Sequence, residues 1–251
     1  MPASTGRPAA PEVIWTRPER AARGPRPAHS RTEIAAAAVR IADAEGIDAV
    51  SMRRVAAEIG AGTMSLYNYV PRKEDLHELM VDAVTGEYEL PERHSGDWRA
   101  DLMALARASR DLLRRHPWVP RLYTSVHGFS PNGLRYLEHC LAALEGLDED
   151  DATKMELLAM VHGAVMTYVS NEVAMEERAR ALPWTPLEEQ AARMAYLTDR
   201  IGGGAYPRVA AALANAGPAV DMDAYFERAI GRILDAYGRG AGRDGSPGPD
   251  A

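Results

Sequence analysis

Apolar residues between positions 30 and 73 recur at helical spacing, in short blocks that glycine residues separate. In the first two blocks they repeat every three or four positions, as on the buried face of an amphipathic helix. These positions are Ile34, Ala38, Ile41 and Ala42, followed by Met52, Val55, Ala56 and Ile59. A third block, residues 63–70, comes after a glycine-containing turn. The pattern predicts three short consecutive helices.

Capping residues and glycines mark where these helices begin and end. Ser30 and Glu33 form a capping box, in which a hydroxyl and a carboxylate satisfy the free amides at a helix start. Gly46 and Gly60 supply the backbone conformation that ends a helix. Thr63 is the predicted cap of the third helix. Two helices joined by a tight turn are typical of helix-turn-helix DNA-binding domains, whose second helix lies in the major groove.

The two faces of the third helix, which ends before Pro71, differ in character. Leu66 and Val70 lie four positions apart and point inward, whereas residues 64, 67 and 68 share the opposite face. Asparagine can pair with adenine, and methionine or tyrosine can contact thymine methyl groups. The predicted DNA contacts are Arg53, Thr63, Met64, Ser65, Tyr67, Asn68, Tyr69 and Lys73. The alternative for the two tyrosines is packing within a small helical domain.

The uneven distribution of charge agrees with DNA contact at one end of the chain. The sequence carries a formal net charge of −7, which by itself does not favour a nucleic-acid partner. Residues 1–73, however, hold eleven Lys and Arg against seven Asp and Glu, a net charge of +4, so residues 74–251 carry −11. A basic segment joined to an acidic one fits phosphate contact through the basic segment only.

Beyond residue 73 the apolar spacing predicts further helices and no strands, so the predicted fold class is all-α. The expected helices are 73–89, 98–116, 120–126, 134–144, 148–180, 185–201, 206–216 and 221–237. The predicted domains are a mobile Arg- and Pro-rich arm (1–29), a helix-turn-helix domain (30–75), a larger helical domain (76–240) and a disordered tail (241–251). The arm is either a disordered tail or a segment whose Arg20, Arg23 and Arg26 reach DNA phosphates or the minor groove.

Motifs of enzymes and of metal sites are absent from the sequence. No nucleophile elbow, zinc-protease motif or phosphate-binding loop occurs, and the histidines form no i, i+4 pair. Cys140, the only cysteine, lies in an apolar helical pattern and is interpreted as a small buried hydrophobe. No run of 18 apolar residues and no signal-peptide core occurs. We therefore expect a cytoplasmic protein with no catalytic residue, no metal, no cofactor and no membrane contact.

These motifs together resemble the amino-terminal domain of the tetracycline-repressor (TetR) family of bacterial transcription regulators. The resemblance rests on IADAEG (41–46), SMRRVAAEIG (51–60), the stretch from Gly62 to Val70 and RKEDL (72–76). The segment WTRPERAARGPRPAHSR (15–31) is similar to the arm of actinobacterial members with a tetracycline-repressor-like carboxy-terminal domain. The specific match covers about residues 13 to 85, with a local similarity at HGAVMTYVSNE (162–172) beyond it.

The resemblance implies a homodimer whose two amino-terminal domains bind a near-palindromic double-stranded operator. Each larger domain would bind a small-molecule effector, which changes the spacing of the DNA-binding domains and releases the operator. The helix of residues 148–180 and the last helix would form a four-helix bundle between subunits. The alternative for the apolar stripe of the last helix is packing on its own subunit. That stripe is Tyr225, Phe226, Ala229, Ile230, Ile233, Leu234 and Tyr237.

The predicted effector pocket is apolar with a few polar groups, as ligand sites in helical domains are. The candidate residues are Trp118, Tyr123, His127, Met160, His162, Met166, Tyr168 and Asn171. The context of His127, SVHGFSP, resembles the place of a metal-chelating histidine in tetracycline-binding members. A second pocket histidine has no counterpart, because Glu87, Tyr88 and Glu89 occupy its region. For each candidate, packing within the domain is the alternative to ligand contact.

The sequence thus favours a DNA-binding transcriptional regulator, a homodimeric repressor that a small hydrophobic effector releases from its operator. Two alternatives of other classes stay open. One is a helical DNA-binding protein whose larger domain only dimerises. The other is a helical enzyme whose site is assembled without a local motif.

Overall fold

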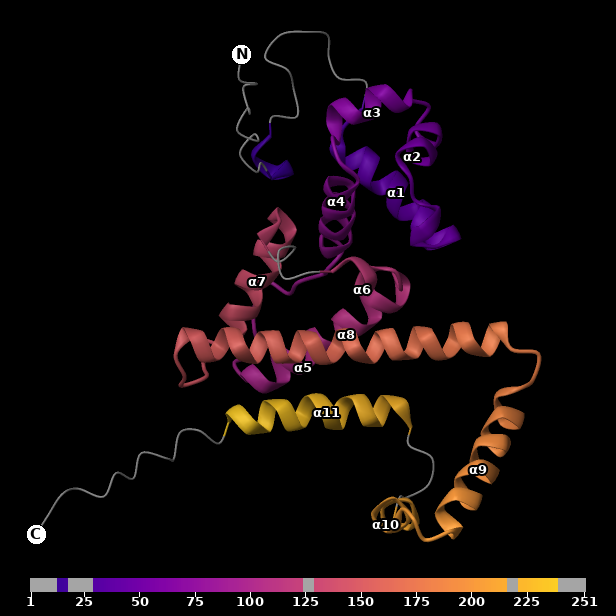
Figure 1. Cartoon of the computed structure of the whole chain (residues 1–251). Coiled ribbons are helices and arrows are strands. Elements are labelled where there is room, and N and C mark those ends of the chain that lie inside the picture. Colours follow the sequence, from indigo (N-terminus) through magenta and orange to yellow (C-terminus); the bar gives the residue numbers. More distant parts are fainter. Residues whose placement is uncertain (1–12, 18–28, 124–128, 216–220, 239–251) are drawn as a thin grey trace, which may run out of the picture. The chain divides into compact units, whose positions relative to one another are not determined.

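A computed structural model describes residues 13–17, 29–123, 129–215 and 221–238, and these residues form helices and no strand (Figure 1). The predicted all-α class is therefore confirmed. The chain divides into two compact units, Met1–Gly146 and Leu147–Ala251. The predicted boundary after residue 75 lies inside the first unit and within the helix Lys73–Thr85. Most of the predicted arm, the segment around His127 and the predicted tail lie outside the described residues.

The first three helices of unit 1 are α1 (Arg31–Glu45), α2 (Met52–Glu58) and α3 (Thr63–Tyr69). We call residues 31–70 the head. The predicted capping box begins α1: the Ser30 amide donates to Glu33 Oε2 at 2.9 Å, and the Glu33 amide donates to Ser30 Oγ at 3.1 Å. A short 3-10 turn, η2 (Ile47–Ala49), follows α1. The predicted order of three short helices is present in the structure.

Glycines end the first two helices of the head as predicted, whereas the predicted cap of the third is wrong. Gly46 and Gly60 have φ angles of +84° and +70°, which side chains with a Cβ rarely adopt. Gly62, not Thr63, is the N-cap of α3, with extended backbone and no side-chain cap. Thr63 already has helical geometry as the first residue of α3, so its hydroxyl cannot serve as the cap.

The interior of the head holds the apolar positions that the helical spacing predicts. Ile34, Ala38, Val55, Leu66 and Val70 are each no more than 1% exposed. Burial of such side chains is the main force that holds short helices together, because helices of seven residues are unstable alone. The inward face of α3 is thereby fixed, and its opposite face is left to solvent.

A segment before α1 packs against the head. Residues 14–16 form the 3-10 turn η1 (Ile14–Thr16), and the Ile14 side chain is only 2% exposed. The guanidinium of Arg31 donates to the carbonyl oxygens of Ile14 at 2.9 Å, Arg17 at 2.8 Å and Tyr69 at 3.1 Å. One side chain therefore joins η1, the start of α1 and the end of α3.

Four further helices complete unit 1: α4 (Lys73–Thr85), α5 (Trp98–Arg115), α6 (Val119–Leu122) and α7 (Pro131–Ala143). Helix α4 packs against α1 on one side and against α7 on another. The Asp82 carboxylate accepts hydrogen bonds from the backbone and side-chain amides of Asn132, at 2.7 and 2.9 Å. Since Asp82 lies on α4 and Asn132 in the first turn of α7, these bonds tie α4 to α7.

Unit 2 consists of α8 (Asp151–Ala181), α9 (Pro186–Gly202), α10 (Pro207–Ala214) and α11 (Met222–Tyr237). With 31 residues, α8 is about 46 Å long. It lies beside α11 (Figure 1). Tyr237 contacts Met160, whereas Phe226 contacts Tyr168, so the two helices run antiparallel. The predicted helices of this region are present, with ends that differ by a few residues.

Two alanine substitutions on α3 test the separation of its faces. Leu66→Ala removes a side chain that is 1% exposed, and we expect it to lower the stability of the head by about 2–5 kcal/mol. Met64→Ala truncates a side chain that is 79% exposed, and we expect a change within about 0.5 kcal/mol. Amide hydrogen exchange of residues 31–70 measures both. Equal loss of protection in the two variants would contradict the assigned faces.

Candidate nucleic-acid interface and effector region

The outer face of α3 presents a compact set of side chains suited to a base-pair edge. Met64 is 79% exposed and Tyr67 is 43% exposed, and Ser65 and Asn68 are exposed beside them. This face carries hydrogen-bond donors and acceptors, apolar surface and no carboxylate. It can therefore approach DNA without repelling phosphates and can contact bases by hydrogen bonds and by apolar surface.

The two ends of α3 are less exposed than its middle. Thr63 and Tyr69 are both half-buried. The carbonyl oxygen of Tyr69 accepts the hydrogen bond from Arg31, so the end of α3 is fixed by its backbone. The half-burial of Tyr69 leaves both alternatives for its ring, packing and DNA contact, as the sequence did.

Cations flank the outer face of α3, and the two adjacent arginines of α2 differ in their surroundings. Arg54 donates to Glu45 and to Glu58, each at 2.9 Å, and the hydrogen bond to Glu45 raises its pKa. Arg53 is exposed, and the part of the chain that the structure describes offers it no ion pair. Lys73 is exposed as the first residue of α4. Arg53 and Lys73 are therefore two exposed cations available to phosphates.

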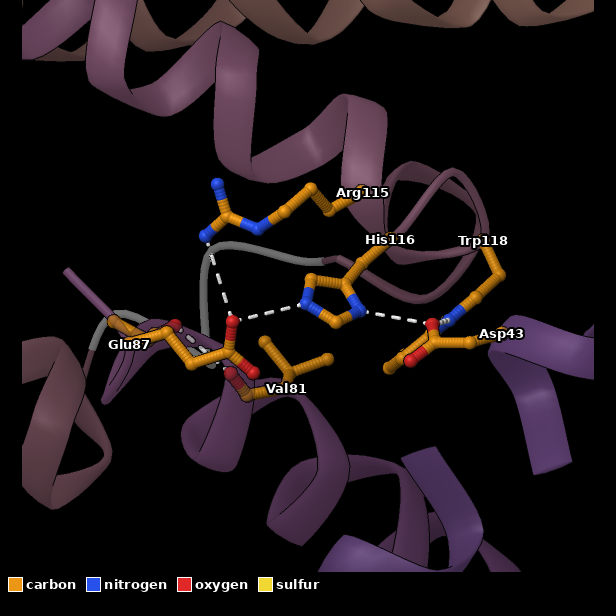
Figure 2. Close-up of polar contacts among 7 residues, drawn as sticks. Asp43, Val81, Glu87, Arg115, His116 and Trp118 are labelled. Carbon is orange, nitrogen blue, oxygen red and sulfur yellow. Dashed lines mark hydrogen bonds and ion pairs between the residues drawn. The ribbon is translucent and has the colours of Figure 1, made fainter. Parts of the chain in front are cut away.

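Trp118, a predicted pocket residue, lies where the corner between α5 and α6 meets the head. Its side chain is buried, and its indole N–H donates to Asp43 Oδ1, at the end of α1, at 2.7 Å (Figure 2). His116 lies between two carboxylates: Nδ1 is 2.8 Å from Asp43 Oδ1, and Nε2 is 3.1 Å from Glu87 Oε2. Arg115 donates to the same Glu87 oxygen at 3.5 Å. We call Asp43, Glu87, Arg115, His116 and Trp118 the head junction.

Sequence reasoning missed the head junction, and no local pattern could have revealed it. Asp43 and His116 are 73 positions apart in the chain. Asp43 belongs to the IADAEG stretch of α1, and nothing in that stretch indicates a distant partner for its carboxylate. The one available signal was Trp118 itself, because a buried indole N–H needs an acceptor.

A row of hydroxyl groups lies between α5, α7 and the segment after α4. The Tyr88 hydroxyl donates to Ser109 Oγ at 2.9 Å, and Ser109 Oγ lies 3.0 Å from the Tyr136 hydroxyl. The rings of Tyr88 and Tyr136 are stacked, with centroids 4.4 Å apart. Burial raises the pKa of Tyr88 to about 12, so this row stays neutral at physiological pH. We call Tyr88, Ser109 and Tyr136 the hydroxyl row.

Two predicted residues lie near the hydroxyl row. Cys140 is buried on α7, and burial raises the pKa of its thiol to about 12, as expected of a small buried hydrophobe. Tyr123, a predicted pocket residue, is half-buried, and burial raises the pKa of its hydroxyl. His127, another predicted pocket residue, lies outside the described residues.

The predicted pocket residues of α8 do not share one face. Asn171 follows His162 by nine positions, or two and a half turns, so the two side chains leave α8 on opposite sides. Met166 lies one turn after His162, on the same side. Tyr168 packs on α11, with its ring centroid 5.4 Å from that of Tyr225 and 5.5 Å from that of Phe226. Burial lowers the pKa of His162.

Met160 and two histidines of unit 1 contact other side chains of the protein. Met160 Sδ accepts a hydrogen bond from the Tyr237 hydroxyl at 3.0 Å. The rings of His94 and His139 lie 4.3 Å apart. Within residues 13–17, 29–123, 129–215 and 221–238, no cluster of three or more His, Cys, Asp or Glu side chains could hold a metal ion. None of the helices among those residues is long and apolar enough to span a membrane.

Comparison with protein families gives two matches that together cover most of the chain. Residues 34–80 match the family described as bacterial regulatory proteins, tetR family. Residues 90–236 match the family described as tetracyclin repressor-like, C-terminal domain. The first match runs from the first turn of α1 into α4, and the second runs from before α5 to the last turn of α11.

Individual relatives agree with these matches. HTH-type transcriptional repressor DrrR1 of Streptomyces coeruleorubidus is 37% identical over 225 residues, which are 89% of this chain and 83% of that protein. An HTH-type transcriptional regulator of Saccharopolyspora erythraea is 32% identical over 93% of this chain and 94% of that protein. The solved structure of the Streptomyces coelicolor TetR family protein ActR in complex with actinorhodin has a TM-score of 0.63 and 26% identity, over 85% of this chain and 99% of that one.

The two lysines of the sequence give a matched test of the DNA-binding surface. Lys73→Gln removes a cation beside α3, and we expect weaker binding to every DNA sequence and a salt dependence reduced by about one counterion. Lys154→Gln makes the same change on α8 and should leave binding unaltered. Fluorescence anisotropy at several salt concentrations measures both.

Asn68→Ala extends the same titrations to base recognition. It should lower the preference for the selected DNA over random DNA by about 1–3 kcal/mol, because a base-edge contact carries sequence information that a phosphate contact lacks. The surface assigned to α3 is wrong if Lys73→Gln and Lys154→Gln bind alike and Asn68→Ala keeps its full preference.

Proposed function

The chain belongs to the tetR family of bacterial regulatory proteins, and from this premise we propose that it is a homodimeric repressor that a small hydrophobic effector releases from operator DNA. DNA binding and transcriptional repression follow from the family, whose members are regulators and not enzymes. The homodimer, the effector and the residues of each site are our proposals for this chain.

The observation that carries the proposal is the division of α3 into a buried and an exposed face. Leu66 and Val70 fix the inner face, so Met64, Ser65, Tyr67 and Asn68 stand together on the outer one. We assign base contacts to this outer face and phosphate contacts to Arg53 and Lys73. A regulator of this design reads sequence through a single short helix, and two copies are needed to span an operator with two half-sites.

For the effector, we propose a site within unit 1, beside the hydroxyl row. A buried row of neutral hydroxyls next to Tyr123 can orient a ligand that is mostly apolar but carries a few hydrogen-bonding groups. The ActR structure holds actinorhodin, which supports small-molecule binding in a relative of the same fold. Effector binding acts on DNA only by favouring a head arrangement that does not fit the operator.

The homodimer is supported by apolar side chains of unit 2 that its own helices leave uncovered. Helices α9 and α10 have no buried residue. Twelve of the seventeen exposed large apolar residues of the described chain lie in unit 2, among them Met175, Trp184, Leu187 and Tyr225. Exposed apolar surface on this scale marks an interaction site. On α11, Phe226, Ile230 and Leu234 are buried, whereas Ile233 is half-buried and available to a second subunit.

The effector hypothesis predicts opposite effects of one compound on two measurements. With actinorhodin as the first probe, we expect a raised melting temperature of the full-length protein and a weakened affinity for DNA selected from a random pool. By linkage, the selected DNA must lower the affinity for the probe by the same factor. Tyr136→Phe, which keeps the ring and removes the hydroxyl, should weaken probe binding and preserve DNA affinity. A probe that raises the melting temperature but leaves DNA affinity unchanged contradicts release by an effector.

The dimer hypothesis predicts a change in mass from one substitution on α11. Ile233→Glu places a carboxylate on the half-buried edge of the helix, and we expect dissociation to monomers because an unpaired charge cannot be buried cheaply. Arg232→Glu introduces the same side chain at the neighbouring exposed position and should leave the dimer intact. Size-exclusion chromatography with light scattering distinguishes the two. Equal masses for both variants would count against an interface on α11.

A further inference from the structure

The head junction connects the end of α1 and the segment after α4 to the corner between α5 and α6 (Figure 2). Asp43 lies in the last turn of α1, and it accepts from His116 at 2.8 Å and from Trp118 at 2.7 Å. Glu87 follows α4, and it meets the other nitrogen of His116 at 3.1 Å. A single side chain of the corner, the imidazole of His116, therefore contacts both the end of α1 and the segment that follows α4.

Both contacts of this bridge are hydrogen bonds from the imidazole to a carboxylate only when both ring nitrogens carry a proton. An ionised carboxylate has only acceptor oxygens, and a neutral imidazole has only one N–H to donate. Asp43 and Glu87 have side-chain exposures of 33% and 41%, so water supports their charge, whereas His116 is only 8% exposed. With both nitrogens facing carboxylates, loss of the second proton turns one hydrogen bond into a contact between two acceptors.

The remaining charged and polar groups at the bridge do not replace that proton. Arg115 donates to Glu87 from α5 at 3.5 Å, and Trp118 donates to Asp43 from the start of α6. Each carboxylate thus keeps a second donor when His116 is neutral, but neither of those donors joins α1 to α4. Only the imidazolium makes both connections at once.

Helix α1 extends this connection to the DNA-binding surface. Its last turn holds Asp43, and its first residue, Arg31, donates to the carbonyl oxygen of Tyr69 at the end of α3. A 15-residue helix is a rigid element about 22 Å long, so its two ends move together. The orientation of α3 is therefore linked, through α1, to what Asp43 contacts.

We propose that His116, as an imidazolium between Asp43 and Glu87, is a positioning residue that fixes the head in its operator-binding orientation, and that loss of its proton weakens operator binding. The inference rests on the DNA-binding surface assigned above, but it needs neither an effector nor the assigned pocket. Fixing the head in advance favours binding, because less freedom remains to be lost when two heads engage the operator.

Operator titrations at two pH values test the proposal on the full-length protein. The probe is a DNA fragment selected from a random pool by the wild-type protein, and anisotropy gives its Kd at about pH 6 and about pH 8, a range in which imidazoles change charge. We expect wild-type affinity to fall roughly five- to tenfold between these values, as for a lost charge-assisted hydrogen bond. His116→Gln should bind weakly at both and show little of this pH dependence.

Two further variants separate positioning from a general loss of structure. Asp43→Asn keeps an acceptor oxygen for Trp118 but removes the charge that holds the imidazolium. We therefore expect it to weaken operator binding as much as His116→Gln does. The variant that combines Asp43→Asn with His116→Gln should bind no more weakly than either single variant. Asp48→Asn is the matched control: Asp48 is 84% exposed and pairs with Arg121 of α6 at 3.0 Å, and exposed pairs contribute little. It should retain the wild-type pH profile.

The outcomes distinguish this inference from the proposed function. If the wild-type protein selects no DNA sequence, the proposed function fails. If it selects an operator and His116→Gln binds it with wild-type affinity and the wild-type pH profile, the inference is overturned and the proposed function stands. If His116→Gln does not fold, Asp43→Asn takes its place: wild-type affinity with the wild-type pH profile in that variant overturns the inference, and weaker binding with little pH dependence supports it. A melting temperature measured for every variant shows whether a lower affinity merely follows lower stability.

Discussion

The packing of α1 against α4 is the constraint on which the DNA-binding head depends. The buried face of α1 contains several alanines, among them Ala35, Ala38 and Ala42, and small side chains allow two helices to approach closely. Because α1 cannot shift without disturbing α4, its two ends move together as one rigid helix. Its first residue, Arg31, reaches the end of α3, and its last turn carries Asp43 into the head junction. Helix α3 is therefore held both by its packing within the head and, through α1, by the corner between α5 and α6.

The features that sequence could predict are those whose signal is local. The Ser30–Glu33 capping box, the glycine stops and the inward pair Leu66 and Val70 all depend on residues within a few positions of one another, and each is present as expected. Helical periodicity likewise located the later helices to within a few residues. The misplaced cap of α3 shows the limit even of local reasoning. Thr63 and Gly62 both tolerate that position, and the backbone geometry of the turn decided between them.

What sequence could not predict are contacts between residues far apart in the chain. Trp118 was predicted to line a pocket, and nothing in the sequence pairs it with Asp43, 75 positions away, which the structure shows as its hydrogen-bond acceptor. The hydroxyl row joins Tyr88, Ser109 and Tyr136 from three separate segments, which share no motif. In α8 the periodicity was sufficient to show that His162 and Asn171 diverge, but not which side a ligand would occupy. Contacts between segments that are distant in the sequence produce no motif of fixed spacing, so a sequence pattern cannot reveal them.

The state of Cys140 has a practical consequence for following the motion of the head. It is the only cysteine of the chain, it is buried on α7, and the raised pKa of its thiol keeps the reactive thiolate scarce at neutral pH. The natural protein therefore resists thiol-reactive reagents without any substitution. A cysteine introduced on an exposed position of α3 would carry a single spectroscopic label, and in the proposed homodimer the distance between the labels of the two subunits would report the spacing of the heads in solution.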